Sequence, residues 1–355
     1  MLNSSRRSCL ILATLLSATA ASAQQAAQPA PPPRPPAANQ ILLDVVVSPK
    51  SGPPVADLQQ QDFTLLDNKF PQVITSFKAV PGREAPADIL IVIDAVNTDY
   101  HVLSFERTQI TKFLRAEGGH LAYPIALAVF TDKGVQIVGN FSSDGNELSA
   151  SLDREDIGLR DLGRSGGFYG ASERLQLSLQ AFRQLTASEA RNPGRKIMVW
   201  VSPGWPLLSG ARIDLDAKQE AQIFADVVRL NTQLLGAGVT VYNVNPLGAT
   251  EALLRTSYYK EFVKGVSKPS QVAAGDLGLQ VLAVQSGGLV LDFNNDVAAL
   301  LQQCLSDIAP YYEISFAAGA AERPDEYHHL EVKIAKPGLT ARTRQGYYAQ
   351  PATHN

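Results

Sequence analysis

The hydrophobic positions of this chain form a continuous run at Ile89–Ile93, which ends in Asp94 and a polar turn. A strand that is apolar on both faces is typical of the centre of a parallel sheet covered by helices on each side. Ile197–Val201 and Val239–Val244 are further runs of this kind. Because strand and helix patterns alternate from 86 to 309, this region predicts a doubly wound α/β domain with a mostly parallel sheet.

The segments between these strands carry the periodicity of amphipathic helices, most clearly at Ala171–Leu185 and Ala217–Leu235. Ile125–Phe130 and Val135–Val138 read as two strands joined by a tight turn at 132–134. A hairpin within a parallel βα pattern predicts one antiparallel edge strand.

Both flanks of the α/β region have strand patterns instead. The N-terminal β segment, 40–82, contains the β-rich run Ile41–Val47, and the C-terminal β segment, 310–350, contains Tyr312–Phe316 and His328–Ile334. Compact domains commonly hold their ends close together. We therefore expect these two segments to pair as a small β-sandwich into which the α/β domain is inserted.

The first residues have the pattern of an export signal. Residues 1–23 combine Arg6 and Arg7, the apolar stretch Cys9–Leu16 and a small-residue cleavage site at 21–23. Residues 24–39 are rich in Pro, Ala and Gln and predict an extended linker. The mature protein is expected to be exported, either periplasmic or secreted, by the general or the twin-arginine route.

Composition narrows the possible functions. The chain is 45% hydrophobic and 18% charged, with a formal net charge of -3, so it can form a large core and has no basic excess for nucleic acid. No apolar run reaches the roughly 20 residues of a spanning helix, so no transmembrane segment is expected. Removal of the signal takes away Cys9, which leaves Cys304 as the only cysteine. Its position in a helical apolar stripe predicts a buried, unreactive thiol.

The carboxyl ends of the central strands are the predicted functional region, because open α/β sheets bind ligands there. We expect a binding rim at this edge of the sheet. It would contain the polar turn after the first strand, an exposed aromatic residue after Val201, and the loops 141–169 and 247–270. The candidate ligand-binding residues are Asp94, Asn97, Thr98, Tyr100 and Trp205.

The strand, aspartate and turn at Ile89–Asn97 resemble the first strand of von Willebrand factor type A (VWFA) domains. The wider pattern resembles the VWFA-related proteins of the acidobacterial type, on the stretches Val45–Ile74, Pro193–Pro206 and Tyr311–Ala349. This resemblance covers nearly the whole mature chain. It implies a von Willebrand factor A-like sheet with helices on both faces.

The resemblance also implies a metal-ion-dependent adhesion site, in which Asp-x-Ser-x-Ser and two later loops hold Mg²⁺. Asp94 matches the first ligand, Val96 stands at the second and Thr98 at the third. The later loops correspond to 166–172, where Ser172 offers a hydroxyl, and to 202–204, which has no carboxylate. Asp94 and Thr98 are too few ligands for Mg²⁺, so we expect a degenerate site and no cofactor. Asp94 would instead cap the next helix or accept backbone N–H groups.

Other catalytic patterns are weak. Gly163–Gly167 fits G-x-S-x-G, but no apolar strand precedes it, as a nucleophile elbow requires. His101, near Asp94, is expected to be a lone surface histidine. The sequence thus predicts a non-enzymatic interaction or adhesion module with an unidentified protein or glycan partner. An exported hydrolase, residual metal-dependent binding at Asp94 and a structural envelope protein remain alternatives.

Overall fold

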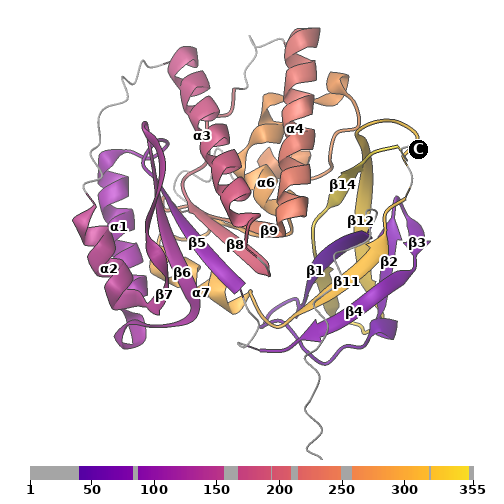
Figure 1. Cartoon of the computed structure of the whole chain (residues 1–355), viewed down its shortest axis with the longest axis horizontal. Coiled ribbons are helices and arrows are strands. Elements are labelled where there is room, and N and C mark those ends of the chain that lie inside the picture. The colour runs from indigo at the N-terminus through magenta and orange to yellow at the C-terminus, as the bar shows by residue number, and fades with distance from the viewer. Residues whose placement is uncertain are drawn as a thin grey trace, which may run out of the picture. The chain divides into compact units, whose positions relative to one another are not determined.

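The computed structural model describes residues 40–82, 87–155, 167–192, 194–208, 215–248, 258–319 and 321–351. Its largest sheet has six strands in the order β10-β9-β8-β5-β6-β7 (Figure 1). These strands are β5 (Ala87–Asp94), β6 (His120–Thr131), β7 (Gly134–Asp144), β8 (Arg195–Val201), β9 (Val239–Val244) and β10 (Val290–Leu291). All neighbours are parallel except β6 and β7, so β7 is an antiparallel edge strand.

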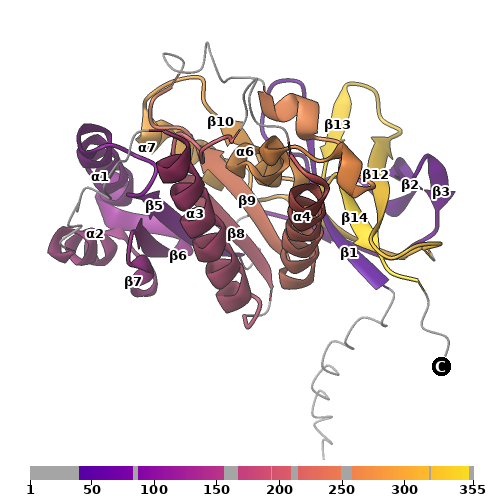
Figure 2. The same ribbon diagram turned by 90° about the horizontal axis from the view of Figure 1, so that it is seen from above.

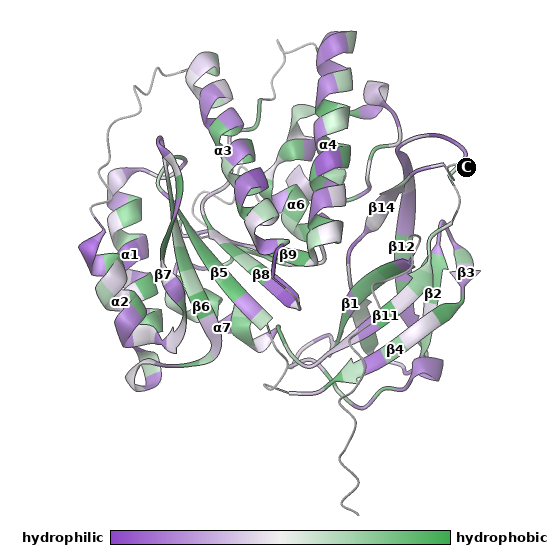
Figure 3. Ribbon diagram, in the orientation of Figure 1, coloured by the Kyte–Doolittle hydropathy of each residue, from purple (hydrophilic) through white to green (hydrophobic). Residues whose placement is uncertain are grey.

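Six α-helices cover the two faces of this sheet in the described part of the chain (Figures 1 and 2). They are α1 (Tyr100–Leu114), α2 (Gly145–Arg154), α3 (Phe168–Glu189), α4 (Ala217–Ala237), α6 (Leu279–Gln285) and α7 (Val297–Ser306). Alternate residues of β5 point to opposite faces. Ile89 and Ile91 pack in a core with α1, α2 and α7, whereas Leu90 and Val92 pack with α3, α4 and α6. Because each face of β5 packs against one of these two cores, the centre of the strand is hydrophobic on both faces (Figure 3).

The described residues of the stretch 141–169 are not the long loop that its polarity suggested, and 156–166 lie outside the described residues. β7 continues to Asp144, whose carboxylate accepts hydrogen bonds from the N–H groups of Asn146 and Glu147 at the start of α2. The sequence did not predict this helix, because its segment is polar and only Leu148 and Leu152 of it pack in the core. Short 3₁₀ helices also interrupt the loops, at Gln60–Asp62, Ala116–Gly119, Tyr258–Phe262, Pro269–Gln271 and Ala274–Leu277.

Two four-stranded sheets, β13-β1-β11-β4 and β14-β12-β2-β3, combine strands from the two flanking segments. The N-terminal strands are β1 (Gln40–Pro49), β2 (Phe63–Asp67), β3 (Phe70–Gln72) and β4 (Ile74–Val80). The C-terminal strands are β11 (Tyr311–Ala317), β12 (Glu326–Ile334), β13 (Leu339–Arg342) and β14 (Gly346–Ala349). β11 lies between β1 and β4, and β12 pairs with β2, all antiparallel. One apolar cluster contains side chains from both sheets, including Leu43, Leu65, Ile314 and Leu330.

Two arginines, one of them buried and the other half-buried, join these sheets to the α/β region. Arg195, the first residue of β8, forms an ion pair with Asp44 of β1 at 3.2 Å and lies over the ring of Tyr311, 4.2 Å from its centre. Arg342 of β13 pairs with Asp307, just beyond α7. Within the described ranges, no helix has both the length and the apolar character needed to cross a membrane.

Candidate functional site

The strand order reverses between β5 and β8. From β5 the chain moves outward to β6 and β7, and from β8 it moves the other way to β9 and β10. In open α/β sheets such a switch point leaves a crevice at the carboxyl ends of the two strands. Asp94 ends β5 and Ser202 follows β8, so both residues lie at this point.

A cavity of about 390 Å³ opens at the switch point. It lies between the turn after β5, the first turns of α3 and the segment after β8, and its lining includes Val96, Asn97, Thr98, Arg174, Pro203 and Leu207. Of the candidate residues, Asn97 and Thr98 therefore line the cavity. Asp94 is below its surface, fully buried.

Four N–H groups hold the Asp94 carboxylate. Oδ1 accepts from the backbone N–H of Val96 at 3.0 Å and of Asn97 at 2.9 Å. Oδ2 accepts from the Asn97 side chain and from the indole of Trp200, both at 2.9 Å. Burial raises the pKa of Asp94, while the hydrogen bonds from Asn97 and Trp200 act in the opposite direction. The cap of α1 is Asp99, whose Oδ1 accepts from the N–H of Val102 at 3.0 Å.

These residues do not fit a Mg²⁺ site. Both oxygens of Asp94 already face N–H donors, which a cation would have to displace. Val96 has no side-chain oxygen, and Thr98 is buried with its hydroxyl 3.4 Å from Oε1 of Glu106. Mg²⁺ requires close to six oxygen ligands in octahedral geometry. Over the ranges that the structure describes, no three His, Cys, Asp or Glu side chains are grouped as metal ligands would be.

Glu106 is a buried carboxyl that the sequence reading missed. It is fully buried on α1, and its Oε2 has no hydrogen-bond partner among the described residues. Burial first, and the nearby charge of Asp94 second, raise the pKa of Glu106 well above 4.5. The sequence did hold a signal, because Glu106 lies three positions after Leu103 and four before Ile110, on the buried stripe of the helix.

The expectation that Trp205 is exposed at the rim is wrong. Trp205 is 1% exposed. Its ring lies 5.3 Å from that of Trp200 and 5.6 Å from that of Phe182, nearly perpendicular to both. The chain turns inward after β8, so the indole fills the core between the sheet and α3 instead of facing solvent.

Four other aromatic side chains are exposed at this edge of the molecule. Tyr100 begins α1, Phe168 and Tyr169 begin α3, and Phe293 follows the end of β10. Their exposed fractions are 64%, 51%, 86% and 55%, respectively. α3 leads through a short turn into the start of β8, so its own first residues lie at the carboxyl edge of the sheet. We call these four residues the aromatic rim. Only Tyr100 was among the sequence candidates.

The remaining candidates do not add catalytic groups. Residues 163–166 of the G-x-S-x-G pattern lie outside the described residues, and Gly167 precedes α3 with a φ of 113°. The ring of His101 contacts that of Tyr100. Cys304 is fully buried, and burial raises the pKa of its thiol.

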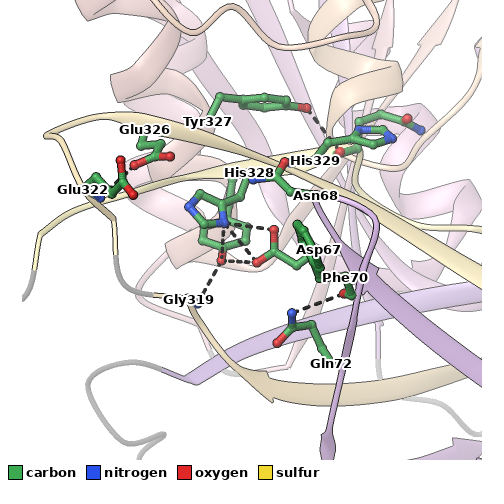
Figure 4. A network of polar contacts seen from close by, with 12 residues as sticks. Asp67, Asn68, Phe70, Gln72, Gly319, Glu322, Glu326, Tyr327, His328 and His329 are labelled. Atoms are coloured by element: carbon green, nitrogen blue, oxygen red, sulfur yellow. Dashed lines mark hydrogen bonds and ion pairs between the residues drawn. The ribbon is translucent and has the colours of Figure 1, made fainter.

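A second polar cluster lies far from this cavity in sequence and joins β2 to β12 and β14 (Figure 4). His328 Nδ1 lies 2.9 and 3.0 Å from the two oxygens of Asp67. The hydroxyl of Tyr347 donates to Asp67 Oδ2 at 2.7 Å and accepts from the N–H of Gly319 at 3.2 Å. We call Asp67, His328 and Tyr347 the clasp. All three are buried, which indicates a structural role in holding the two ends of the chain together.

The solved structures that resemble this chain share little of its sequence. No family model matches the chain, and no curated protein is significantly similar in sequence. Proximal thread matrix protein 1 from the mussel byssus aligns over 68% of this chain and 51% of its own, with 11% identity and a TM-score of 0.35. The SpRpn10 VWA domain aligns over 63% of this chain and 98% of its own, with 11% identity and a TM-score of 0.32. The TFIIH p34 N-terminal domain aligns over 62% and 97%, with 15% identity and a TM-score of 0.29.

The chain thus spans about half the length of the mussel protein. The class of fold is defined by the mostly parallel six-stranded sheet with helices on both faces, which is a doubly wound α/β fold.

Proposed function

We propose that this protein is an exported, non-enzymatic interaction module that binds a protein or glycan partner at the carboxyl edge of its central sheet. The observation that carries the proposal is the aromatic rim, a set of exposed aromatic side chains at the same carboxyl edge of the sheet as the cavity. Tyr and Phe are enriched at protein interfaces, where they contribute much of the binding energy. Isolated exposed aromatics are common, but four at one edge of the sheet support a binding surface there.

The chemistry of the cavity supports binding instead of catalysis. Of the residues known to line it, only Asp99 and Arg174 are charged, and no His or Cys is present in that lining. Asp99 is already used as the cap of α1. A hydrolase would need a nucleophile and a base within hydrogen-bond reach of each other. Nothing in this lining favours the hydrolase alternative.

Binding in this proposal does not depend on a metal. The support is the set of N–H donors around Asp94, which takes up the lone pairs that Mg²⁺ would need. Export is supported by the signal-like residues 1–23.

The proposal also includes the arrangement of the two four-stranded sheets. Because they share an apolar cluster, we infer that they form one β-sandwich into which the α/β region is inserted.

The test compares two variants of the full chain, each of which loses exposed apolar side chains from a different surface. The rim variant carries Tyr100→Ser, Tyr169→Ser and Phe293→Ser. The control variant carries Phe70→Ser and Val73→Ser, which are 72% and 80% exposed in or beside β3. Each is immobilised and exposed to envelope proteins and glycans of the producing cell, with and without EDTA.

We expect one bound species to be retained by the unmodified protein and the control variant and lost by the rim variant, with no effect of EDTA. Equal retention by the rim variant would contradict the location of the site. Loss on addition of EDTA would contradict metal-independent binding.

A further inference from the structure

A cavity of about 340 Å³ lies along α1, next to the end of α2. Its described lining consists of Asp153 of α2 and six residues of α1. The six recur every three or four positions and therefore share one face of the helix: Tyr100, Leu103, Ser104, Arg107, Thr108 and Thr111. They cover about three turns, or about 16 Å. We call this site the α1 cavity. Among the described residues it shares no lining with the cavity at the switch point.

Contacts between α1 and α2 fix the shape of the α1 cavity. Arg107 Nη2 donates to the carbonyl of Leu152 at 2.9 Å and to that of Glu155 at 3.3 Å, both at the end of α2. Arg115, directly after α1, forms an ion pair with Asp153 at 3.1 Å. Because contacts within the protein hold these walls in place, the site is preformed and binding has few side chains to order.

The polar groups of the wall include both donors and acceptors of hydrogen bonds. In the described part of the chain, the bonds from Arg107 to α2 use Nη2, which leaves Nη1 and Nε as donors. The ion pair of Asp153 uses Oδ2, which leaves Oδ1 as an acceptor. The hydroxyl of Thr108 donates to the Ser104 carbonyl at 3.0 Å, so its oxygen is available to accept. The hydroxyls of Ser104 and Thr111 can do either.

The charge and the aromatic ring of the wall indicate the class of ligand. Arg107 and Asp153 are the charged residues of the described lining, and their charges cancel, so the wall favours neither an anion nor a cation. Tyr100, 64% exposed, is at one end, and its ring contacts that of His101 edge-on. A tyrosine ring presents an apolar, electron-rich face, on which the C–H bonds of a sugar ring can pack. Hydroxyls that donate and accept, on a ring with apolar faces, are the chemistry of a saccharide.

An extended peptide fits the α1 cavity less well. Peptide recognition commonly uses a free strand edge for the peptide backbone or a set of apolar pockets for its side chains. The wall is a helix, whose backbone groups bond within the helix. Leu103 is 2% exposed, so Tyr100 is the one large apolar group of the described lining that a ligand can reach.

We propose that the α1 cavity binds a neutral saccharide, with Tyr100 stacked on a sugar ring and with Thr108, Thr111 and Asp153 hydrogen-bonded to its hydroxyls. The volume of about 340 Å³ lies within the range of small-molecule sites, which begins at about 300 Å³. This inference goes beyond the proposed function, because the α1 cavity shares only Tyr100 with the aromatic rim.

The experiment uses four neutral trisaccharides as probes: maltotriose, cellotriose, laminaritriose and tri-N-acetylchitotriose. Trigalacturonate is the anionic comparator, and N-acetyl-triserine amide is a peptide comparator that also carries hydroxyls. Each compound is titrated into the full chain while the backbone amide signals of α1 are followed by NMR.

The main variant combines Thr108→Val and Thr111→Val, which removes two hydroxyls and keeps the shape of the side chains. Its control combines Thr64→Val and Thr340→Val, both exposed on strands of the flanking segments. The control is matched, because Thr340, like Thr108, donates to a backbone carbonyl. Tyr100→Ser tests the stacking.

We expect at least one trisaccharide to shift the α1 signals saturably and to bind about tenfold or more tightly than either comparator. The main variant should weaken that binding by about tenfold, since each lost hydrogen bond contributes about two- to tenfold, and Tyr100→Ser should weaken it by a similar factor. The control should bind as the unmodified protein does. Failure of all four trisaccharides to bind, unchanged binding by the main variant, or binding of a comparator as tight as that of the best trisaccharide would overturn the inference.

The variant Tyr169→Ser separates the α1 cavity from the aromatic rim. Tyr169 belongs to the rim and is not in the described lining of the α1 cavity, so its loss should leave trisaccharide binding unchanged. Loss of trisaccharide binding by Tyr169→Ser would place the saccharide at the rim and overturn this inference alone. Trisaccharide binding by Tyr169→Ser, together with retention of the envelope partner by the rim variant, would overturn the proposed function alone.

Discussion

The clasp gives the most direct test of how the two ends of the chain are held together. The perturbation is Tyr347→Phe, which removes one hydroxyl and preserves the ring that stacks on His328. Burial first, and the hydrogen bond to Asp67 second, raise the pKa of Tyr347, so the phenol stays protonated and donates to the carboxylate. The substitution therefore removes a donor from Asp67 Oδ2 and an acceptor from the N–H of Gly319.

The expected loss follows from these two contacts. The bond to Asp67 is 2.7 Å long and charge-assisted, which contributes about 1.5–3 kcal/mol, and the neutral bond from Gly319 contributes about 1 kcal/mol. The total is about 2.5–4 kcal/mol in the free energy of unfolding. The control is Tyr348→Phe, because the Tyr348 hydroxyl donates one neutral bond of 3.1 Å to the Val266 carbonyl. That change should cost about 0.5–1.5 kcal/mol.

The assay is calorimetric melting of both variants at neutral pH. In a chain of this size 1 kcal/mol corresponds to about 2 °C, so Tyr347→Phe should lower the melting temperature by about 5–8 °C and Tyr348→Phe by about 1–3 °C. A double-mutant cycle with Asp67→Asn should show an interaction of at least about 1 kcal/mol, since the two groups are in contact. An equal loss in the two tyrosine variants, or an additive cycle, would refute this reasoning.

Three further predictions concern the carboxyls and the two ends of the chain. Burial raises the pKa of Glu106 well above 4.5, so the folded state holds that proton more tightly than the unfolded state, and the resulting stability is lost as the pH rises above about 4.5. The variant Glu106→Gln cannot ionise and should therefore show a smaller fall in the urea midpoint of unfolding between pH 5 and 8. A fall equal to that of the unmodified protein would refute this. Because N–H groups occupy both oxygens of Asp94, millimolar Mg²⁺ or Mn²⁺ should leave the melting temperature unchanged, and a clear rise would show that a cation binds. Deletion of 40–80 should remove the hydrogen-exchange protection of β11, which loses both neighbouring strands, and retained protection would contradict the pairing.

The elements of the α/β region could be predicted from the sequence because their signals are local. Ile89–Ile93 reads as a central strand, since each of its residues is buried against one of two cores. The hairpin at 132–134 likewise predicts the antiparallel edge strand that the structure has in β7. α2 escaped prediction, since only one side of a ten-residue helix reaches the core and the rest looks like loop.

The site was less predictable because its decisive contacts are not local. Trp205 follows a strand end, a position that usually leads outward, and no local pattern shows that the core has room for a second indole beside Trp200. The clasp is a clearer case, since Asp67 and His328 are 261 positions apart in the sequence. Nothing in either segment marks these residues as partners until β2 and β12 pair.

For Asp94, the sequence predicts the position of the residue and the structure shows its hydrogen-bond partners. Its position after the first strand follows from the sequence, and so does the loss of hydroxyl and carboxylate ligands around it. The sequence does not show what replaces those ligands. In the structure Trp200 lies on β8, next to β5, and its indole N–H reaches Oδ2 of Asp94 from across the switch point. A tryptophan and an asparagine thus satisfy the buried carboxylate with hydrogen bonds.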